Sequence, residues 1–360
     1  MLAFGVVVLV GWQHDGRSSL LNPAAEAAGI TPTTSPVAGP VKLTEIGKVW
    51  PRWDPREVDD LPPASATTAP ALPEVIRPPA SAPLMVDDPV GVAVAAVERG
   101  GVAYLLSPCG AWRTVPLDGR YPVLALSPGG SKLAVAYSDR ALDVTVYDLG
   151  TGRVDVLPEP SAAKLWDLSW WMFLSEDELI LDGRQASYVV DIDSGSVEKV
   201  PIAPGLSRAV DPAGHVLVSA NWGDRNVLTD YRAGTPREVS MRLTGRLSTI
   251  RADANTVAGT SYQKRPYALY VADRATLTPQ ASLPLRDRSG YSNGGLRTLA
   301  LTKNGQVLFH FAAAGPNKSG HRVVAWDPRD GRLSLVSTDS LGDSTSVVFA
   351  EGLLRNTRSR

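Results

Sequence analysis

The best-placed candidate for covalent chemistry in this sequence is Gly290-Tyr-Ser-Asn-Gly294. Its spacing matches the G-x-S-x-G elbow, in which a strained strand-to-helix turn presents a serine for acyl transfer. An elbow needs a helix after it, then an aspartate and a histidine in that order. Here His321 precedes Asp327, and only 66 residues follow Gly294. We therefore interpret 290–294 as a Gly-rich surface loop and predict that the chain has no catalytic residue and is not an enzyme; a hydrolase that uses this loop is an alternative.

The sequence also contains no clear metal-binding or redox motif. Asp191-Ile-Asp-Ser-Gly195 has part of a calcium loop but lacks the downstream glutamate and the flanking helices. The same pattern recurs as Asp148-Leu-Gly-Thr-Gly152, so we predict a structural turn whose aspartate accepts hydrogen bonds from turn amides. The four histidines share no ligand spacing, and no metal or cofactor is expected. The single Cys109 excludes an internal disulfide and is expected to be a free thiol.

The elements that carry these residues repeat about every forty residues. Each copy reads strand, tight turn, strand, loop, and then a third strand that ends in aspartate. The third-strand ends fall at Asp148, Asp191, Asp230, Asp273 and Asp327, spaced by 43, 39, 43 and 54 residues. Four-stranded units at this period are typical of β-propeller blades, whose sheets cover one another's faces. The sequence therefore predicts an all-β protein, a propeller of six (alternatively seven) four-stranded blades over 88–354.

The first blade lacks one strand of its own. Val90–Val97, Val102–Leu106 and Trp112–Leu117 supply three strands. We expect Ser344–Ala350, at the other end of the chain, to supply the fourth and to close the ring, which removes a free sheet edge. Residues 355–360 are left as a basic tail.

The connections between strands sort onto two faces. First-to-second and third-to-fourth connections are tight, whereas the other connections are longer and emerge on the opposite face, here called the long-loop face. Variable loops on a rigid scaffold are where binding groups usually sit, and aromatic and arginine side chains dominate binding hot spots. The predicted binding residues are Trp222, Arg225, Tyr262, Arg265, Tyr267, Arg288 and Tyr291.

The amino terminus predicts a location. Residues 1–12 are apolar and uncharged, but eleven helical residues span only about 17 Å of a ~30 Å hydrocarbon core. We interpret them as a partial membrane anchor or signal region, which predicts a single-pass protein of the cell membrane with its propeller outside the cytoplasm. The alternative is an ordinary cytoplasmic amino terminus.

Residues 13–87 are rich in Pro, Ala and Thr, a composition that predicts a semi-extended spacer. Within this range, Trp50 and Trp53 break the pattern. We expect both to dock against the side of the propeller; a short partner-binding motif is the alternative.

One repeat also carries a family resemblance. Leu126-Ser-Pro-Gly-Gly-Ser-Lys-Leu-Ala134, followed by Val146-Tyr-Asp-Leu-Gly-Thr-Gly-Arg153, resembles the repeat of bacterial WD40-like propellers, including the TolB-type group. The anchor and spacer resemble those of membrane-anchored actinobacterial propeller proteins. The resemblance implies a non-catalytic binding scaffold.

With a net charge of −1, no nucleic acid is expected. We predict a monomer that binds an envelope protein or glycan, with a cytosolic WD40-like interaction protein as the alternative function.

Overall fold

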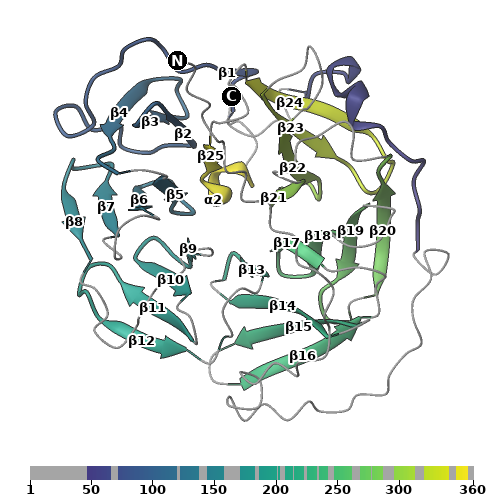
Figure 1. Cartoon of the computed structure of the whole chain (residues 1–360). Helices are drawn as coiled ribbons and strands as arrows, with labels where there is room; N and C mark the ends of the chain where they lie inside the picture. Colours follow the sequence, from purple (N-terminus) through teal and green to yellow (C-terminus); the bar gives the residue numbers. More distant parts are fainter. Residues whose placement is uncertain are drawn as a thin grey trace, which may run out of the picture.

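A computed structural model gives the arrangement of the chain (Figure 1). It describes residues 47–65, 72–119, 122–137, 144–157, 171–182, 186–200, 202, 207–213, 215–222, 225–232, 235–241, 247–261, 268–276, 278–286, 296–312, 320–339 and 346–355. The described strands pair into sheets that stand radially around a central axis, and apart from β1 (Val75–Ile76) neighbouring strands within each sheet are antiparallel. The chain folds as a β-propeller.

The blades follow one another in sequence order, and each begins with the strand nearest the axis. Blade one contains β25 (Ser346–Phe349), β2 (Ala95–Arg99), β3 (Val102–Leu106) and β4 (Trp112–Pro116). Blade two contains β5 (Pro122–Leu126), β6 (Lys132–Tyr137), β7 (Thr145–Asp148) and β8 (Val154–Val156). Blade three contains β9 (Trp171–Phe173), β10 (Glu178–Asp182), β11 (Ser187–Asp191) and β12 (Val197–Val200).

The second half of the ring repeats the plan. Blade four contains β13 (Ser207–Val210), β14 (Val216–Trp222), β15 (Arg225–Arg232) and β16 (Thr235–Met241). Blade five contains β17 (Leu247–Ala252), β18 (Thr256–Ser261), β19 (Ala268–Asp273) and β20 (Pro279–Pro284). Blade six contains β21 (Arg297–Leu301), β22 (Val307–Ala312), β23 (His321–Trp326), β24 (Leu333–Asp339) and an added strand, β1 (Val75–Ile76).

The added strand corrects one expectation. The sequence predicted six, or alternatively seven, blades of four strands each, whereas five sheets have four strands and the remaining sheet has five. The fifth strand, β1, comes from the range expected to be a spacer and pairs in parallel with β24. The period of the repeat could not reveal this strand, because β1 lies outside the repeats.

The ring closes as the sequence predicted. β25 pairs antiparallel with β2, with Ala95 opposite Phe349 and Glu98 opposite Ser346. The two ends of the propeller therefore share one sheet, in which β2 is paired on both sides and β25 is the strand next to the axis. This prediction is confirmed.

The hydrophobic core consists of layers between adjacent blades. One cluster joins blades five and six through Leu269, Phe309 and Trp326, and another joins blades six and one through Leu308 and Phe349. Equivalent clusters lie between blades one and two, between blades two and three, and between blades three and four. Each sheet is therefore buried on the faces that it turns toward its neighbours, and a single blade would expose both.

The aspartates of the tight turns accept hydrogen bonds from turn amides, as the sequence predicted. The Asp148 carboxylate accepts hydrogen bonds from the amides of Gly150 and Thr151 at 3.0 and 2.8 Å. Asp191 and Asp273 accept equivalent bonds from the amides of Ser194 and Thr276. Hydrogen bonds from the side chains and backbones of Ser194 and Thr276 lower the pKa of the Asp191 and Asp273 carboxyls. These residues form structural turns, as the sequence predicted.

An extended segment, here called the strap (residues 47–65 and 72–88), runs along the rim of the ring. In Figure 1 it passes from the right side, beside β20, over the top to β4 at the upper left. Its pairings are all parallel: Val49 with Ser282 and Trp53 with Leu285 on blade five, Pro63 with Leu335 on blade six, and Leu84 with Thr114 on blade one. A short 3-10 helix, η2 (Pro55–Asp60), lies between the contacts to blades five and six.

The two tryptophans of the strap dock as predicted. Trp53 is 7% exposed and packs edge-on against Phe309 and Phe311, with ring centroids 5.8 and 5.9 Å apart. The Trp50 indole N–H donates to the carbonyl of Pro328 at 3.0 Å. The composition of 13–87 predicted a spacer, yet its described parts are held by backbone hydrogen bonds, because the outer strands of finished blades offer unpaired donors and acceptors.

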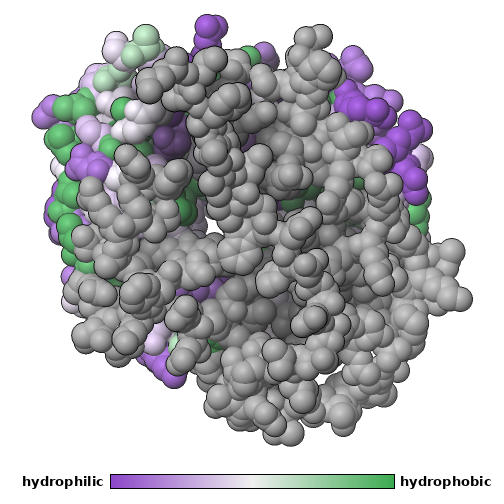
Figure 2. All heavy atoms as spheres, viewed as in Figure 1, coloured by the Kyte–Doolittle hydropathy of each residue, from purple (hydrophilic) through white to green (hydrophobic). Residues whose placement is uncertain are grey.

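The strap does not follow the whole rim. Among the described residues, β8 of blade two has no strap partner, and its Val154 and Val156 are 44% and 63% exposed. Figure 2 shows hydrophobic residues in green along this left rim. Residues 1–46, with the predicted anchor at 1–12, lie outside the described residues, and of the predicted tail only Arg355 is described. No helix among the described residues is long and apolar enough to cross a membrane.

Candidate functional site

The predicted binding residues fall into two groups. Tyr262, Arg265, Tyr267, Arg288 and Tyr291 lie outside the described residues, as does the 290–294 loop. Trp222 ends β14 and Arg225 begins β15, and their Cα atoms are partners across the hairpin. The structure therefore places the backbones of Trp222 and Arg225 together on the long-loop face, and the rest of the predicted set stays a prediction.

The same end of blades five and six carries a second group of residues near the axis, here called the axial cluster (Thr249, Arg297, Thr298, His310 and His321). The strands nearest the axis in these blades are β17 and β21, and residues 287–295, which lie outside the described residues, directly precede Leu296 and β21 in sequence. Residues 287–295 include two of the predicted binding residues, Arg288 and Tyr291. The predicted site and the axial cluster are thus continuous along the chain.

The backbone of the axial cluster is strained. Thr249 has φ 45°, a left-handed conformation that a β-branched residue rarely adopts. Its hydroxyl bonds to the Thr260 hydroxyl at 2.9 Å and accepts from the Thr298 amide at 3.0 Å, so it joins blade five to blade six. Strain of this kind persists only where the surroundings enforce it, and it is concentrated at functional sites.

The two strands of the cluster that lie nearest the axis, β17 and β21, are also bulged. The register of β17 against β18 shifts between Ser248 and Arg251, and that of β21 against β22 shifts between Thr298 and Ala300. A bulge adds a residue to one strand and redirects the side chains near it. The strands of blades five and six that lie nearest the axis are therefore irregular at the same height.

Arg297 is the charged group of this cluster. Its side chain is exposed, yet protein atoms surround it closely enough that desolvation lowers its pKa, with a smaller lowering from the nearby Arg251. Among the described residues, no carboxylate forms an ion pair with Arg297. Within the part of the chain that the structure describes, no carboxylate therefore compensates its charge beside the axis.

Two histidines lie behind this arginine. His310, 7% exposed, is the cross-strand partner of Arg297. Its ring stacks on that of His321 with centroids 4.7 Å apart, and the facing ring nitrogens are 2.7 Å apart. Desolvation, followed by the charges of His321 and Arg297, holds the pKa of His310 well below its usual value. His310 is thus neutral near pH 7, and Arg297 supplies the positive charge.

At the opposite, tight-turn end, the axis is covered by charged groups that have partners. The short helix α2 (Glu351–Leu354) follows β25, and its Glu351 carboxylate pairs with Arg251. Arg355 donates to the Val210 carbonyl at 2.9 Å. Desolvation raises the pKa of Glu351, although Arg251 and Arg355 oppose the rise. The two ends of the axis therefore differ, because Arg251 at the tight-turn end has a carboxylate partner and Arg297 at the long-loop end has none among the described residues.

The arrangement suits binding of an anionic group better than it suits the chemistries considered from the sequence. Within the described ranges, no group of three His, Cys, Asp or Glu residues could hold a metal ion. Cys109 is free and exposed, as expected. A guanidinium beside stacked rings and hydroxyls can instead bind a carboxylate or phosphate through paired hydrogen bonds.

Comparisons with known proteins support the fold. The sequence matches no protein-family profile and none of the curated proteins compared with it. The structure is similar to TolB from Acinetobacter baumannii, with TM-score 0.51 and 14% identity over 72% of this chain. The match spans 66% of TolB, just under two thirds of its length. The predicted resemblance to TolB-type, WD40-like propellers is confirmed as a likeness of fold.

The comparisons also correct one prediction. The β-propeller domain of the trilobed protease from Pyrococcus furiosus matches with TM-score 0.44 and 15% identity, over 65% of this chain and 76% of that domain. The acylaminoacyl peptidase of Pyrococcus horikoshii matches with TM-score 0.46 and 12% identity, over 80% of this chain and 50% of the peptidase. The prediction that this chain is not an enzyme is therefore wrong as drawn, because a protease and a peptidase also contain this fold, and a propeller does not exclude enzymatic activity.

Sequence reasoning missed Thr249, Arg297 and His310. One usable signal was present, because arginines occur in the axial strands of three consecutive blades, at Arg208, Arg251 and Arg297. The first two pair with Asp182 and Glu351. Only the structure shows that the third has no such partner among the described residues.

Proposed function

We propose that this protein is an extracytoplasmic binding scaffold whose contact surface is the long-loop face around the axial cluster. The observation that carries the proposal is Arg297, a guanidinium held beside the axis without a carboxylate partner among the described residues. Burying or crowding a charge is costly, and an anionic group on a partner would offset that cost. The partner we propose is an envelope protein or glycan that presents a carboxylate or phosphate.

The preorganised geometry of the axial cluster favours the long-loop face, rather than the opposite face, as the binding surface. The Thr249 hydroxyl bonds to the Thr260 hydroxyl and accepts a hydrogen bond from the Thr298 amide, so the two axial strands are held together before any partner arrives and little ordering would accompany binding. Trp222 and Arg225 flank the same side of the ring, on the β14–β15 hairpin. At the tight-turn end, by contrast, Arg251 already has Glu351 as its partner.

The location is also a proposal and rests on sequence. The apolar residues 1–12, followed by a Pro/Ala/Thr-rich stretch, favour a propeller tethered to the cell membrane through its amino terminus and displayed outside the cytoplasm. Protease treatment of intact spheroplasts tests it. An exported propeller is digested, whereas a cytosolic one is protected and would refute the proposed location.

Binding is tested by recovering partners from envelope extracts with the wild-type chain and with Arg297→Ala and Trp222→Ala. The matched control is Arg332→Ala, because the Arg332 side chain is 81% exposed and lies on the tight-turn side, paired with Asp330. We expect the same partner to be lost with Arg297→Ala and Trp222→Ala and retained with Arg332→Ala, at unchanged melting temperature. Equal recovery by all four proteins would place the contact elsewhere and refute the proposed surface.

A further inference from the structure

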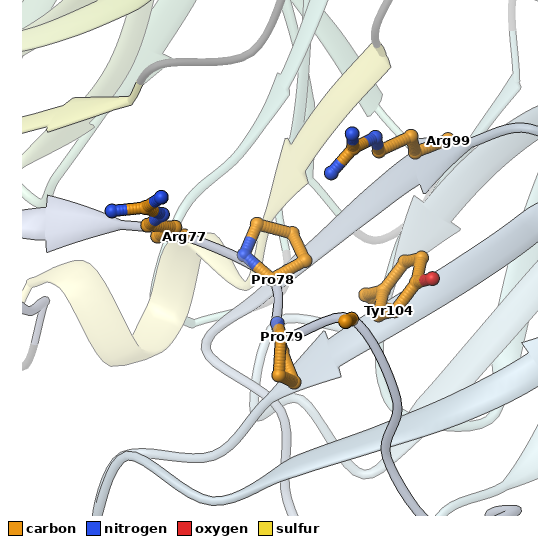
Figure 3. Close-up of a pocket in the computed structure, with 6 residues that line it drawn as sticks. Arg77, Pro78, Pro79, Arg99 and Tyr104 are labelled. Atoms are coloured by element: carbon orange, nitrogen blue, oxygen red, sulfur yellow. The ribbon is translucent and has the colours of Figure 1, made fainter.

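A groove lies on the rim between blades six and one, under the strap. It encloses about 520 Å³ and is lined by Arg77, Pro78, Pro79, Ala80, Arg99 and Tyr104. The first four residues belong to the strap, and the other two come from β2 and β3 (Figure 3). In Figure 3, Pro78 lies between Arg77 and Arg99, and the Tyr104 ring faces the strap from the sheet. This volume is in the range of small-ligand sites.

The wall supplied by the strap is fixed at both ends. Before the groove, the Thr338 amide donates to the Glu74 carbonyl at 2.9 Å. After it, the Thr114 amide donates to the Pro83 carbonyl at 2.9 Å. The two prolines between these tethers restrict φ and remove two backbone donors, so this part of the chain has few alternative conformations. The groove is therefore largely preformed.

The charges in the groove are of one sign. Arg77 and Arg99 are both exposed. Within the described chain, no carboxylate forms an ion pair with either of them, although at least nine other arginines have such partners. An anion in the groove would be attracted by the positive charge of both guanidinium groups.

The remaining lining sets the shape of the ligand. The guanidinium forks of Arg77 and Arg99 match carboxylate and phosphate oxygens, and the Tyr104 hydroxyl adds one more donor. Pro78 is buried and Pro79 and Tyr104 are half-buried, so their rings offer an apolar wall. A free ion would use only the donors, whereas an oxyanion on a small apolar body would use both parts of the groove.

We propose that this groove binds an oxyanion, carboxylate or phosphate, carried by a small molecule whose apolar part lies against Tyr104 and the two prolines. The site lies on the rim at the long-loop end of blades six and one, and none of its lining residues belongs to the axial cluster. Because one wall belongs to the strap and the other to blade one, the ligand also bridges these two parts.

The test is calorimetric titration of the full chain with inorganic phosphate and, separately, with succinate, at constant ionic strength. The variants are Arg77→Ala, Arg99→Ala and Tyr104→Phe. Arg52→Ala is the matched control, because Arg52 is an exposed arginine on the same strap but outside the groove. We expect Arg77→Ala and Arg99→Ala each to weaken binding about tenfold or more and Arg52→Ala to leave it unchanged.

The two titrations distinguish the two kinds of oxyanion. Binding of phosphate indicates a phosphate ligand, binding of succinate indicates a carboxylate ligand, and either result supports the site. Amide chemical shifts of Ala80, Gly100 and Gly101 should move with the bound probe. The proposal is overturned if neither probe binds saturably, if Arg52→Ala weakens binding as much as Arg77→Ala, or if the shifts lie elsewhere in the ring.

Discussion

The buried ion pair between blades three and four allows a sharp test of what holds neighbouring blades together. Arg208 donates to the Asp182 carboxylate at 2.5 Å, and both side chains are 2% exposed. The Ser187 hydroxyl also donates to Asp182, at 2.7 Å. Asp182→Asn keeps the shape of the side chain but removes the negative charge. Breaking a buried pair on one side typically costs about 3–5 kcal/mol, because the other charge remains buried.

For a domain of this size, such a loss lowers the melting temperature by about 6–20 °C. Unfolding in urea, followed by circular dichroism, measures the free energy directly. The control is the same substitution at Asp330, whose pair with Arg332 is exposed and should contribute less than about 1 kcal/mol. The double variant Asp182→Leu/Arg208→Met should recover most of the stability. If Asp182→Asn unfolds like the wild type, Arg208 is solvated in the folded chain and the reasoning is refuted.

Four further predictions follow the same logic. Burial lowers the pKa of His310 below its usual 6.5, so below pH 6.5 the unfolded chain binds a proton at this residue that the folded chain does not bind. The free energy of unfolding should therefore fall by about 1.4 kcal/mol per pH unit below pH 6.5. His310→Phe should remove that slope in denaturant titrations from pH 5 to 7. Glu176→Ala removes the acceptor of the Ser127 hydroxyl and the Gly129 amide in blade two, which should cost about 1–3 kcal/mol in urea unfolding. Trp53→Ala should cost about 3–5 kcal/mol and expose residues 47–65 to limited proteolysis, and an unchanged digest would contradict docking of the strap. Truncation at Leu341 deletes β25 and should give an aggregating chain in size-exclusion chromatography; a monomer that melts like the intact protein would argue against closure through β25.

The fold could be predicted from sequence because its determinants are local and repeated. Aspartates such as Asp148 and Asp191 mark the third strand of a blade, and glycines supply the positive φ of the turns. Gly130, for example, has φ 73°, and a Cβ there would lie 2.2 Å from the Ala93 carbonyl oxygen. Closure followed from counting strands, since blade one lacked one and Ser344–Ala350 had no other sheet to join.

The strap and the axial cluster could not be predicted in the same way. The strap is stabilised by sheet edges that exist only once the blades have formed. Its Pro-rich composition indicated an extended form, and Trp50 and Trp53 indicated docking at one point, but neither disclosed the backbone pairing with three blades. The conformation of Thr249 is imposed by bonds to blade six, which is distant in sequence. The pairing of His310 with His321 follows from the register of β22 and β23, which the spacing of the histidines alone did not disclose.

The strap also has a mechanical consequence. It touches blades five, six and one in turn, always in parallel pairing, and Gly47 is its first described residue. Tension applied to the chain at Gly47 acts first on the hydrogen bonds to β20, then on those to β24, and only last on those to β4. The contacts to three sheets must therefore break one after another before the load reaches the joint between β25 and β2. A propeller tethered through this segment would resist pulling at its rim without opening its ring.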